Sequence, residues 1–316
     1  MSIISSIYKK AVIHRYDDNG YIKYFSAADF SGLKAEPVSF LSGKNTLRGF
    51  FYSYENCRSD ALIIFCHGIG GGHLSYMTEI ELLCRAGYRV LAYDNTGCMT
   101  SDGENIVCLS QSLADLDAAV THLKKEGIFN KYESVYVIGH SWGGFAAGNI
   151  AAFHPEIKKA VVIAGFISVK NLLMGVLKGE NGAKKLVINK ILDFEKEIAP
   201  KYCDANTAET VKNTNTKFLF AYSKNDPAVS YNHNAALLPK TENTDFIIFD
   251  DRLHNPNYTL DAVTYMNKVF ADFNKKKIKL RTLEQKKEYF AAADWVRMTR
   301  QDEDFWKQVL AFFEKN

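Results

Sequence analysis

The sequence predicts an α/β fold built on a mostly parallel sheet, and three features favour that class. Short β-branched segments alternate with longer helical ones along most of the chain, which is typical of right-handed βαβ units. Of the 316 residues, 47% are hydrophobic and 24% are charged, a globular composition that excludes disordered, collagen-like and coiled-coil proteins. No repeat and no low-complexity linker divides the chain, so we expect a single domain over residues 1–316.

The expected strands begin with an antiparallel edge. Val38–Leu41 and Leu47–Tyr54 flank a Ser-Gly-Lys-Asn turn signal and therefore predict a hairpin. The later strands are short apolar runs of the kind buried in parallel sheets. They are expected at Ala61–Cys66, Arg89–Tyr93, Ser134–Ile138, Lys159–Ala164, Lys217–Tyr222 and Asp245–Phe249.

Helical stretches fill the intervals between these strands. They are expected at Thr78–Ala86, Leu113–Lys125 and Gly143–Phe153. A last amphipathic stretch, Asp302–Glu314, places aromatic residues at helical spacing and is expected to cover the sheet. Residues 167–216 contain no obvious strand and look helical, so they interrupt the alternation of strand and helix.

The motif that carries chemistry lies at residues 139–143, which read Gly-His-Ser-Trp-Gly. It follows the expected strand Ser134–Ile138 and opens a helix of small residues, so Ser141 stands on a tight strand-to-helix turn. Glycines two residues to either side let neighbouring backbone approach without a Cβ clash. The N-terminus of the following helix points at the site. This context predicts that Ser141 is a nucleophile rather than a structural turn residue.

With this motif in place, the chain resembles the α/β-hydrolase fold superfamily over nearly its whole length. The resemblance implies the α/β-hydrolase fold, with helices on both faces of the sheet. That family orders its triad as nucleophile, acid and histidine, which implies Ser141, Asp226 and His254. Asp226 follows a strand in Ser-Lys-Asn-Asp-Pro, and His254 lies in the loop after the last strand. Other carboxylates near that strand remain alternatives for the acid: Asp245, Asp250 and Asp251.

A second motif, His-Gly-Ile-Gly-Gly-Gly at residues 67–72, comes directly after a buried strand. In the family this loop supplies half of the oxyanion hole. The resemblance therefore implies that the backbone N–H groups of Ile69 and Trp142 bind the tetrahedral oxyanion. Gly68 is a candidate substrate-binding residue, because a glycine lets the backbone approach the substrate closely.

The family also implies where substrate contacts arise. It usually places a helical cap over the site in the interval that here spans residues 167–216, part of which could line an acyl pocket. Phe166 and Ile167, just past a strand end, are further substrate-binding candidates. Residues 255–301 are expected to form a helical insertion before the final core helix.

Several function classes are excluded or disfavoured. A net charge of +3 gives no electrostatic reason to expect nucleic acid, and no apolar run reaches the ~20 residues that span a bilayer. The six cysteines form no CxxC pair and are expected to be reduced, which favours a cytoplasmic location. No metal-binding spacing is present, and serine acyl transfer needs no cofactor.

These features predict a serine hydrolase whose small-molecule substrate is a carboxylic ester of small or medium acyl size. An enzyme resembling the family's serine aminopeptidases, or an acyltransferase, is the alternative. An aminopeptidase would need a carboxylate for the α-amino group, and Glu180, Glu195 and Glu197 are candidates. A third possibility is a non-catalytic hydrolase-like binding protein, although an intact triad argues against it.

Overall fold

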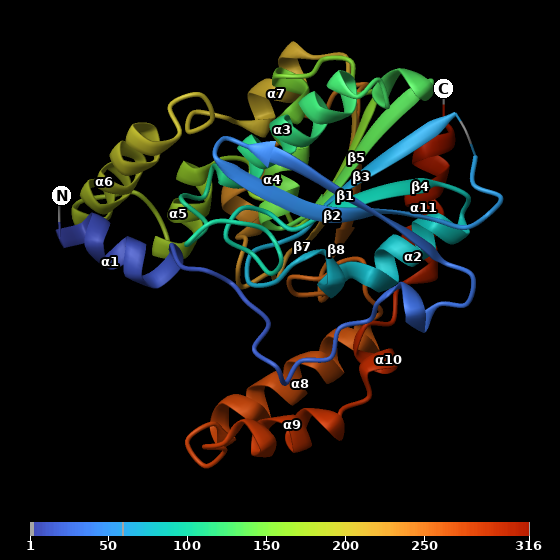
Figure 1. Ribbon diagram of the computed structural model, residues 1–316. Helices are drawn as coiled ribbons and strands as arrows, with labels where there is room; N and C mark the ends of the chain where they lie inside the picture. Colours follow the sequence, from blue (N-terminus) through green and yellow to red (C-terminus); the bar gives the residue numbers. More distant parts are fainter. Residues whose placement is uncertain (1–2, 59, 316) are drawn as a thin grey trace.

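The computed structural model describes residues 3–58 and 60–315 and is built around one eight-stranded sheet (Figure 1). The strands follow the spatial order β1-β2-β4-β3-β5-β6-β7-β8. Their bounds are β1 Lys34–Ser42, β2 Asn45–Ser53, β3 Ala61–Cys66, β4 Arg89–Tyr93, β5 Ser134–His140, β6 Lys159–Ile163, β7 Lys217–Ser223 and β8 Thr244–Phe249. Each of the eight lies where the sequence predicted a strand.

The pairing of the strands confirms the predicted fold class. β1 pairs antiparallel with β2, and β2 pairs antiparallel with β4. Every other pairing in the sheet is parallel. The hairpin turns between Ser42 and Asn45, where Gly43 has a φ of 57° that a glycine adopts without strain. The carboxyl ends of β3, β5, β7 and β8 therefore share one edge of the sheet.

Two helical layers bury the two faces of this sheet. On one face, α3 (Gln111–Lys125) and α4 (Trp142–Asn149) pack against Leu62 and Ile64 of β3. On the other face, α2 (Met77–Arg85) and α11 (Glu303–Glu314) pack against Ile63 and Phe65 of the same strand. All six residues of β3 are buried, since alternate side chains enter opposite cores. This explains why β3 appears in the sequence as an unbroken apolar run.

Three helices occupy the long interval between β6 and β7. They are α5 (Val169–Leu177), α6 (Ala183–Ile198) and α7 (Thr207–Asn213). The N-terminal helix α1 (Ile3–Val12) packs on α6 (Figure 1). The ring of Tyr8 on α1 makes an edge-on contact with the ring of Phe194 on α6, with centroids 5.9 Å apart. Segments almost two hundred residues apart in the chain thus support each other.

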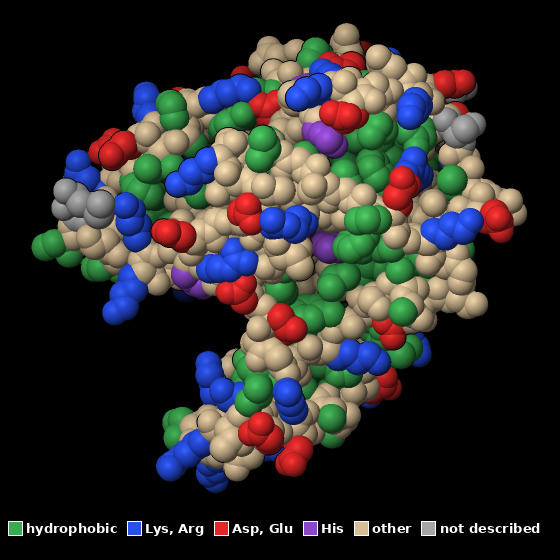
Figure 2. Space-filling model, viewed as in Figure 1, with side chains coloured by type: hydrophobic (Ala, Val, Ile, Leu, Met, Phe, Trp, Pro, Cys, Tyr) green, Lys and Arg blue, Asp and Glu red, His purple; other side chains and the backbone are tan. Residues whose placement is uncertain are grey.

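The first three helices after β8 form an arm below the sheet (Figure 1). They are α8 (Leu260–Lys276), α9 (Leu283–Ala291) and α10 (Trp295–Met298). Figure 2 shows a hollow between this arm and the body of the molecule, with hydrophobic side chains near the junction. The N-terminal segment crosses to the arm, where the ring of Tyr21 stacks on that of Phe290 at 5.4 Å. No helix in the described part of the chain is long and apolar enough to cross a membrane.

Short 3-10 turns complete the described elements. They lie at Ala27–Asp29, His73–Tyr76, Phe129–Lys131, Ile150–Ala152, Tyr231–His233 and Ala235–Leu237. The turn His73–Tyr76 joins the glycine-rich loop after β3 to α2. All six cysteines are free, and five of them are buried.

Candidate active site

Ser141 stands in a strained turn between β5 and α4. Its φ is 55° and its ψ is −112°, a conformation that L-residues rarely adopt. The Ser141 N–H donates a hydrogen bond of 2.8 Å to the carbonyl of Ile163 on the neighbouring strand β6. This hydrogen bond to the sheet therefore helps to keep Ser141 in its strained conformation. Ser141 lies at the carboxyl edge of the sheet.

Two glycines make this turn sterically possible. A Cβ added at Gly139 would lie 2.2 Å from the carbonyl oxygen of Gly143, and one added at Gly143 would lie 2.1 Å from the carbonyl oxygen of Cys66. Both neighbours are backbone atoms and cannot move aside cheaply. The glycines of the motif are thus required by the close approach of β3, β5 and α4.

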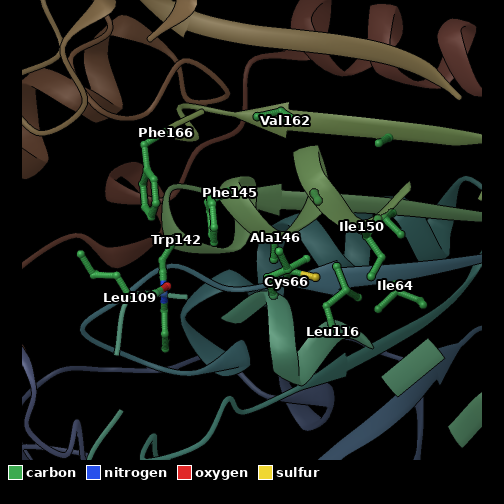
Figure 3. Close-up of a cluster of buried hydrophobic side chains, with 14 of the residues drawn as sticks. Ile64, Cys66, Leu109, Leu116, Trp142, Phe145, Ala146, Ile150, Val162 and Phe166 are labelled. Atoms are coloured by element: carbon green, nitrogen blue, oxygen red, sulfur yellow. The ribbon is translucent and has the colours of Figure 1, made fainter. Parts of the chain in front are cut away.

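The helix after Ser141 is anchored by its first side chain (Figure 3). The indole N–H of Trp142 donates to the carbonyl of Leu109 at 2.5 Å, and the Ser112 hydroxyl donates to the carbonyl of Trp142 at 3.0 Å. Trp142 is the first residue of α4, so its backbone N–H has no acceptor within the helix. This N–H is one of the two predicted oxyanion donors.

Asp226 and His254 meet at the same edge of the sheet. Oδ2 of Asp226 lies 2.7 Å from Nδ1 of His254, while Oδ1 accepts the backbone N–H groups of Ala228 and Val229 at 2.8 and 3.0 Å. The Asp226 side chain is fully buried, and that of His254 is 22% exposed. A carboxylate at Nδ1 holds the proton there, which leaves Nε2 free as a base.

The histidine loop is held against the acid loop. The N–H of Arg252 donates to the Ser223 hydroxyl, and the N–H of Leu253 donates to Oδ1 of Asn225, both at 2.9 Å. The Arg252 guanidinium also forms an ion pair of 3.0 Å with Asp302 at the start of α11. Among the described residues, no hydrogen bond joins the Ser141 hydroxyl to His254, a contact that often tightens only when substrate binds.

The alternative acids have other partners. Asp245 pairs with Lys315 at 3.0 Å and Asp250 with Lys224 at 2.7 Å. The Asp251 carboxylate is 57% exposed and lies 3.8 Å from Arg252. Of the four candidate carboxylates, Asp226 is thus the one that contacts His254.

A hydrogen-bonded bridge joins the histidine loop to the glycine-rich loop. Nε2 of His140 donates to the carbonyl of His254 at 2.8 Å, so Nδ1 of His140 accepts from the Tyr76 hydroxyl at 2.9 Å. The Tyr76 oxygen in turn accepts the N–H of Gly68 at 3.0 Å. Burial is the larger cause that lowers the pKa of His140 to about 3, and the charge of His254 is the second. His140 is therefore a neutral structural link at neutral pH.

The glycine-rich loop itself runs close to Ser141. A Cβ at Gly68 would lie 2.6 Å from the Tyr76 hydroxyl and 3.3 Å from Cβ of Ser141. Ile69 follows with 37% of its surface exposed. Sequence reasoning identified this loop but missed Tyr76, whose only sequence signal is its position at the end of the same loop.

Comparison with known proteins identifies the family and the fold. The family described as serine aminopeptidase, S33 matches residues 58–241. The chain belongs to that family. Its fold is shared by the esterase Pf2001 of Pyrococcus furiosus, with a TM-score of 0.54 and 21% identity over 82% of this chain and 93% of that one. Est1E of Butyrivibrio proteoclasticus, solved with ferulic acid, gives a TM-score of 0.55 and 19% identity over 77% and 99% of the chains.

Curated relatives of this S33 member match over a shorter stretch. Bifunctional epoxide hydrolase 2 of Rattus norvegicus is 35% identical over 105 residues, which is 33% of this chain. The AB hydrolase superfamily protein YfhM of Bacillus subtilis is 31% identical over 106 residues, or 32% of this chain and 35% of that protein. The chain matches only 18% of the length of the rat protein. These relatives are hydrolases, and membership of a hydrolase family is what they support.

The remaining predicted site residues of this S33 protein lie in different surroundings. Phe166 and Ile167 are buried in the core, where the ring of Phe166 stacks on that of Phe145 at 4.7 Å (Figure 3). Their contact with substrate stays a prediction. Among the described residues, no group of three or more His, Cys, Asp or Glu side chains could hold a metal ion.

The three glutamates considered for an α-amino group differ in availability. Glu195 is fully buried, and its carboxylate accepts hydrogen bonds from the Tyr8 hydroxyl and the backbone N–H groups of Leu109 and Ser110. Glu180 forms an ion pair of 2.9 Å with Lys170. Glu197 is exposed on α6. Glu195 is therefore a structural group rather than a ligand for substrate.

Proposed function

We propose that this S33 family member is a serine hydrolase that cleaves a carboxylic ester of small or medium acyl size. The observation that carries the proposal is the Asp226–His254 pair, joined at 2.7 Å beside the strained turn of Ser141. A buried carboxylate that orients a histidine near a serine on such a strained turn is the arrangement that activates a hydroxyl.

In the proposed reaction, Nε2 of His254 takes the proton of the Ser141 hydroxyl as its oxygen attacks the ester carbonyl. The N–H groups of Ile69 and Trp142 stabilise the oxyanion. The intermediate collapses, the alcohol leaves with the proton from His254, and an acyl-enzyme remains. Water then attacks with the same base, which releases the acid and restores Ser141.

The nucleophile favours an ester over an epoxide. If the Ser141 oxygen opened an epoxide, the product would be an ether, which this machinery could not hydrolyse. Attack on an ester instead gives an acyl-enzyme that water cleaves readily. The epoxide hydrolases among the relatives therefore support a hydrolase, while Ser141 supports acyl chemistry.

An aminopeptidase is the second candidate, because the matched family carries that name. It would need a carboxylate near the pocket for the substrate's α-amino group. The buried bonds of Glu195 remove one candidate, which leaves the half-buried Glu180 and the exposed Glu197. The ester proposal needs no such group and is the simpler fit.

The proposal is tested by intact mass after reaction with a small fluorophosphonate. We expect one adduct on the wild type and on Ser39→Ala, whose serine is exposed on β1, and none on Ser141→Ala. A substrate panel then compares simple esters with aminoacyl amides. Absence of an adduct on folded wild type would overturn the serine mechanism, and amide turnover without ester turnover would favour the aminopeptidase.

A further inference from the structure

A cavity of about 430 Å³ begins at the loop that carries the predicted oxyanion donor. Gly70, which lines it, is the neighbour of Ile69. The same cavity is lined by Leu74 and Ser75 from the turn before α2, and by Tyr258 just beyond the histidine loop. Its volume lies within the range of about 300–1,000 Å³ that small-molecule pockets occupy.

Most of the wall comes from outside the matched family region, residues 58–241. One side comes from the N-terminal segment between Asn19 and Phe25, and the other comes from α8 and α10 of the arm. Only the segment from Gly70 to Thr78 belongs to the family core. The cavity is thus something that the two flanking segments add beside the predicted reaction centre.

The side chains in this wall are largely apolar and bulky. They include Ile22 and Phe25 from the N-terminal segment, Met266 and Phe270 from α8, and Trp295 and Met298 from α10. The methionines suit a pocket that adapts to chains of different shape. Two lysines, Lys23 and Lys277, are present, and no Asp or Glu occurs among the described residues that line the cavity. The wall therefore suits a hydrocarbon chain and disfavours a substrate ammonium group.

We propose that this cavity binds the hydrocarbon chain of the ester substrate, and the proposal rests on the serine-hydrolase function above. The chain extends from the carbonyl at Ser141 past Ile69 and Gly70 and enters between the N-terminal segment and α8. Either the acyl or the alcohol part of an ester can supply such a chain, and the test below separates these two sources.

The first test changes the size of the cavity at Met266. We expect Met266→Trp to lower the ratio of kcat/KM for long over short chains by about tenfold or more, since a methylene in an apolar pocket is worth at least that much. Met266→Ala should shift the preference toward longer chains. Lys268→Trp adds the same ring on an exposed position of α8, outside the cavity, and should keep the wild-type ratio.

Two substrate series identify the source of the chain. In p-nitrophenyl esters from acetate to decanoate only the acyl part grows, and in alkyl acetates from ethyl to decyl only the alcohol part grows. A changed ratio in one series assigns the cavity to that part of the ester. Unchanged ratios in both series, with an active wild type, would overturn the proposal.

The second test is independent of turnover and uses Trp295 as a probe in Ser141→Ala. A brominated fatty acid should quench fluorescence, and Trp295→Phe should remove most of that effect. Quenching that is unchanged in Trp295→Phe would overturn the cavity proposal. If Trp295 reports binding but no ester is cleaved by wild type, the proposed function fails while the binding site stands.

Discussion

At the scale of single residues, Asp226 combines two tasks through its two oxygens. Oδ1 is fixed by the N–H groups of Ala228 and Val229, so Oδ2 is aimed at Nδ1 of His254. Backbone donors thus set the direction of the carboxylate, and the carboxylate sets the tautomer of the imidazole. The orientation of the Asp226 carboxylate is thus fixed by the backbone of its own turn and not by side-chain packing.

Asp226→Asn should separate these tasks. The amide oxygen can keep the two backbone hydrogen bonds, but the amide NH₂ would then face Nδ1 and favour the wrong tautomer of His254. We expect ester turnover to fall by about 10⁴ while the melting temperature stays close to that of the wild type. Asp250→Asn, at an 81% exposed carboxylate, is the control, and comparable turnover in both variants would contradict the role of Asp226.

His140 should make stability depend on pH. Its pKa is lowered to about 3 in the folded protein, whereas an unfolded histidine titrates near 6.5. Between these values the unfolded chain binds a proton that the folded chain does not, so stability is present above about pH 6.5 and is lost as the pH falls toward 3.

Urea unfolding of His140→Gln measures this contribution. The wild type should lose up to about 1.4 kcal/mol per pH unit from this one group over that window, and the variant should show a slope smaller by that amount. His67, whose pKa is also lowered by burial, supplies a background slope in both proteins. Equal slopes in the two proteins would show that His140 does not stay neutral when folded.

The sequence located some of these residues and not others. The motif and the family resemblance singled out Ser141, Asp226 and His254, each of which follows a strand, and strand ends share one edge of a parallel sheet. Their catalytic roles stay a proposal. The Tyr76–His140 link could not be predicted, since it depends on how a 3-10 turn and a strand end meet in space. The same holds for the hydrogen bonds of Glu195.

At the scale of elements, the turn around Ser141 is where three backbones come closest. β3, β5 and α4 meet at Gly139 and Gly143, where the neighbouring backbone leaves no space for a side chain. Such contacts explain why the strand-turn-helix unit tolerates the strained φ of Ser141: the surrounding backbone permits few other paths.

Gly143→Ala should therefore prevent folding or lower the melting temperature severely. Its new Cβ would lie 2.1 Å from the carbonyl oxygen of Cys66. The control is Gly127→Ala, at a φ of 66° with nothing within 4 Å of the added Cβ, which should cost only about 1–2 kcal/mol. Thermal melts compare the two, and a Gly143→Ala protein as stable as Gly127→Ala would contradict the steric argument.

Element prediction succeeded where a turn signal or a buried apolar run marks the strand. β1 and β2 flank the predicted turn, and β3 to β7 are almost wholly buried runs. The amphipathic stretch Asp302–Glu314 forms α11 against the sheet. Helix α1 was not predicted. It is a short helix whose exposed Ile3 and Ile7 blur its pattern, and its inner residues Ile4, Tyr8 and Val12 gain their support from the core that includes α6.

At the scale of the whole molecule, Glu195 ties three distant segments together. Its Oε1 accepts from the Tyr8 hydroxyl on α1 and from the N–H of Leu109, each at 2.8 Å. Its Oε2 accepts from the N–H and hydroxyl of Ser110 at the start of α3, at 3.0 and 2.7 Å. Leu109 in turn holds the indole of Trp142, so this one carboxylate supports both α1 and the turn of Ser141.

Glu195→Gln should destabilise the protein by about 1–3 kcal/mol, since the amide nitrogen cannot accept and one pair of buried donors loses its partner. Glu197→Gln, on an exposed position of the same helix, should change the urea midpoint little. Equal midpoints for the two variants would show that Glu195 is not a structural group, and its role as an α-amino ligand would return to consideration.

The pairing of Tyr21 with Phe290 has a consequence for how such a protein can diverge. The N-terminal segment and the arm face each other through aromatic surfaces, and both lie outside the matched S33 core. A chimera that replaced only one of them would present an unmatched aromatic face to solvent and lose one wall of the cavity. The two flanking segments therefore have to be exchanged as a unit, and recombination between relatives is expected to conserve them together or remove them together.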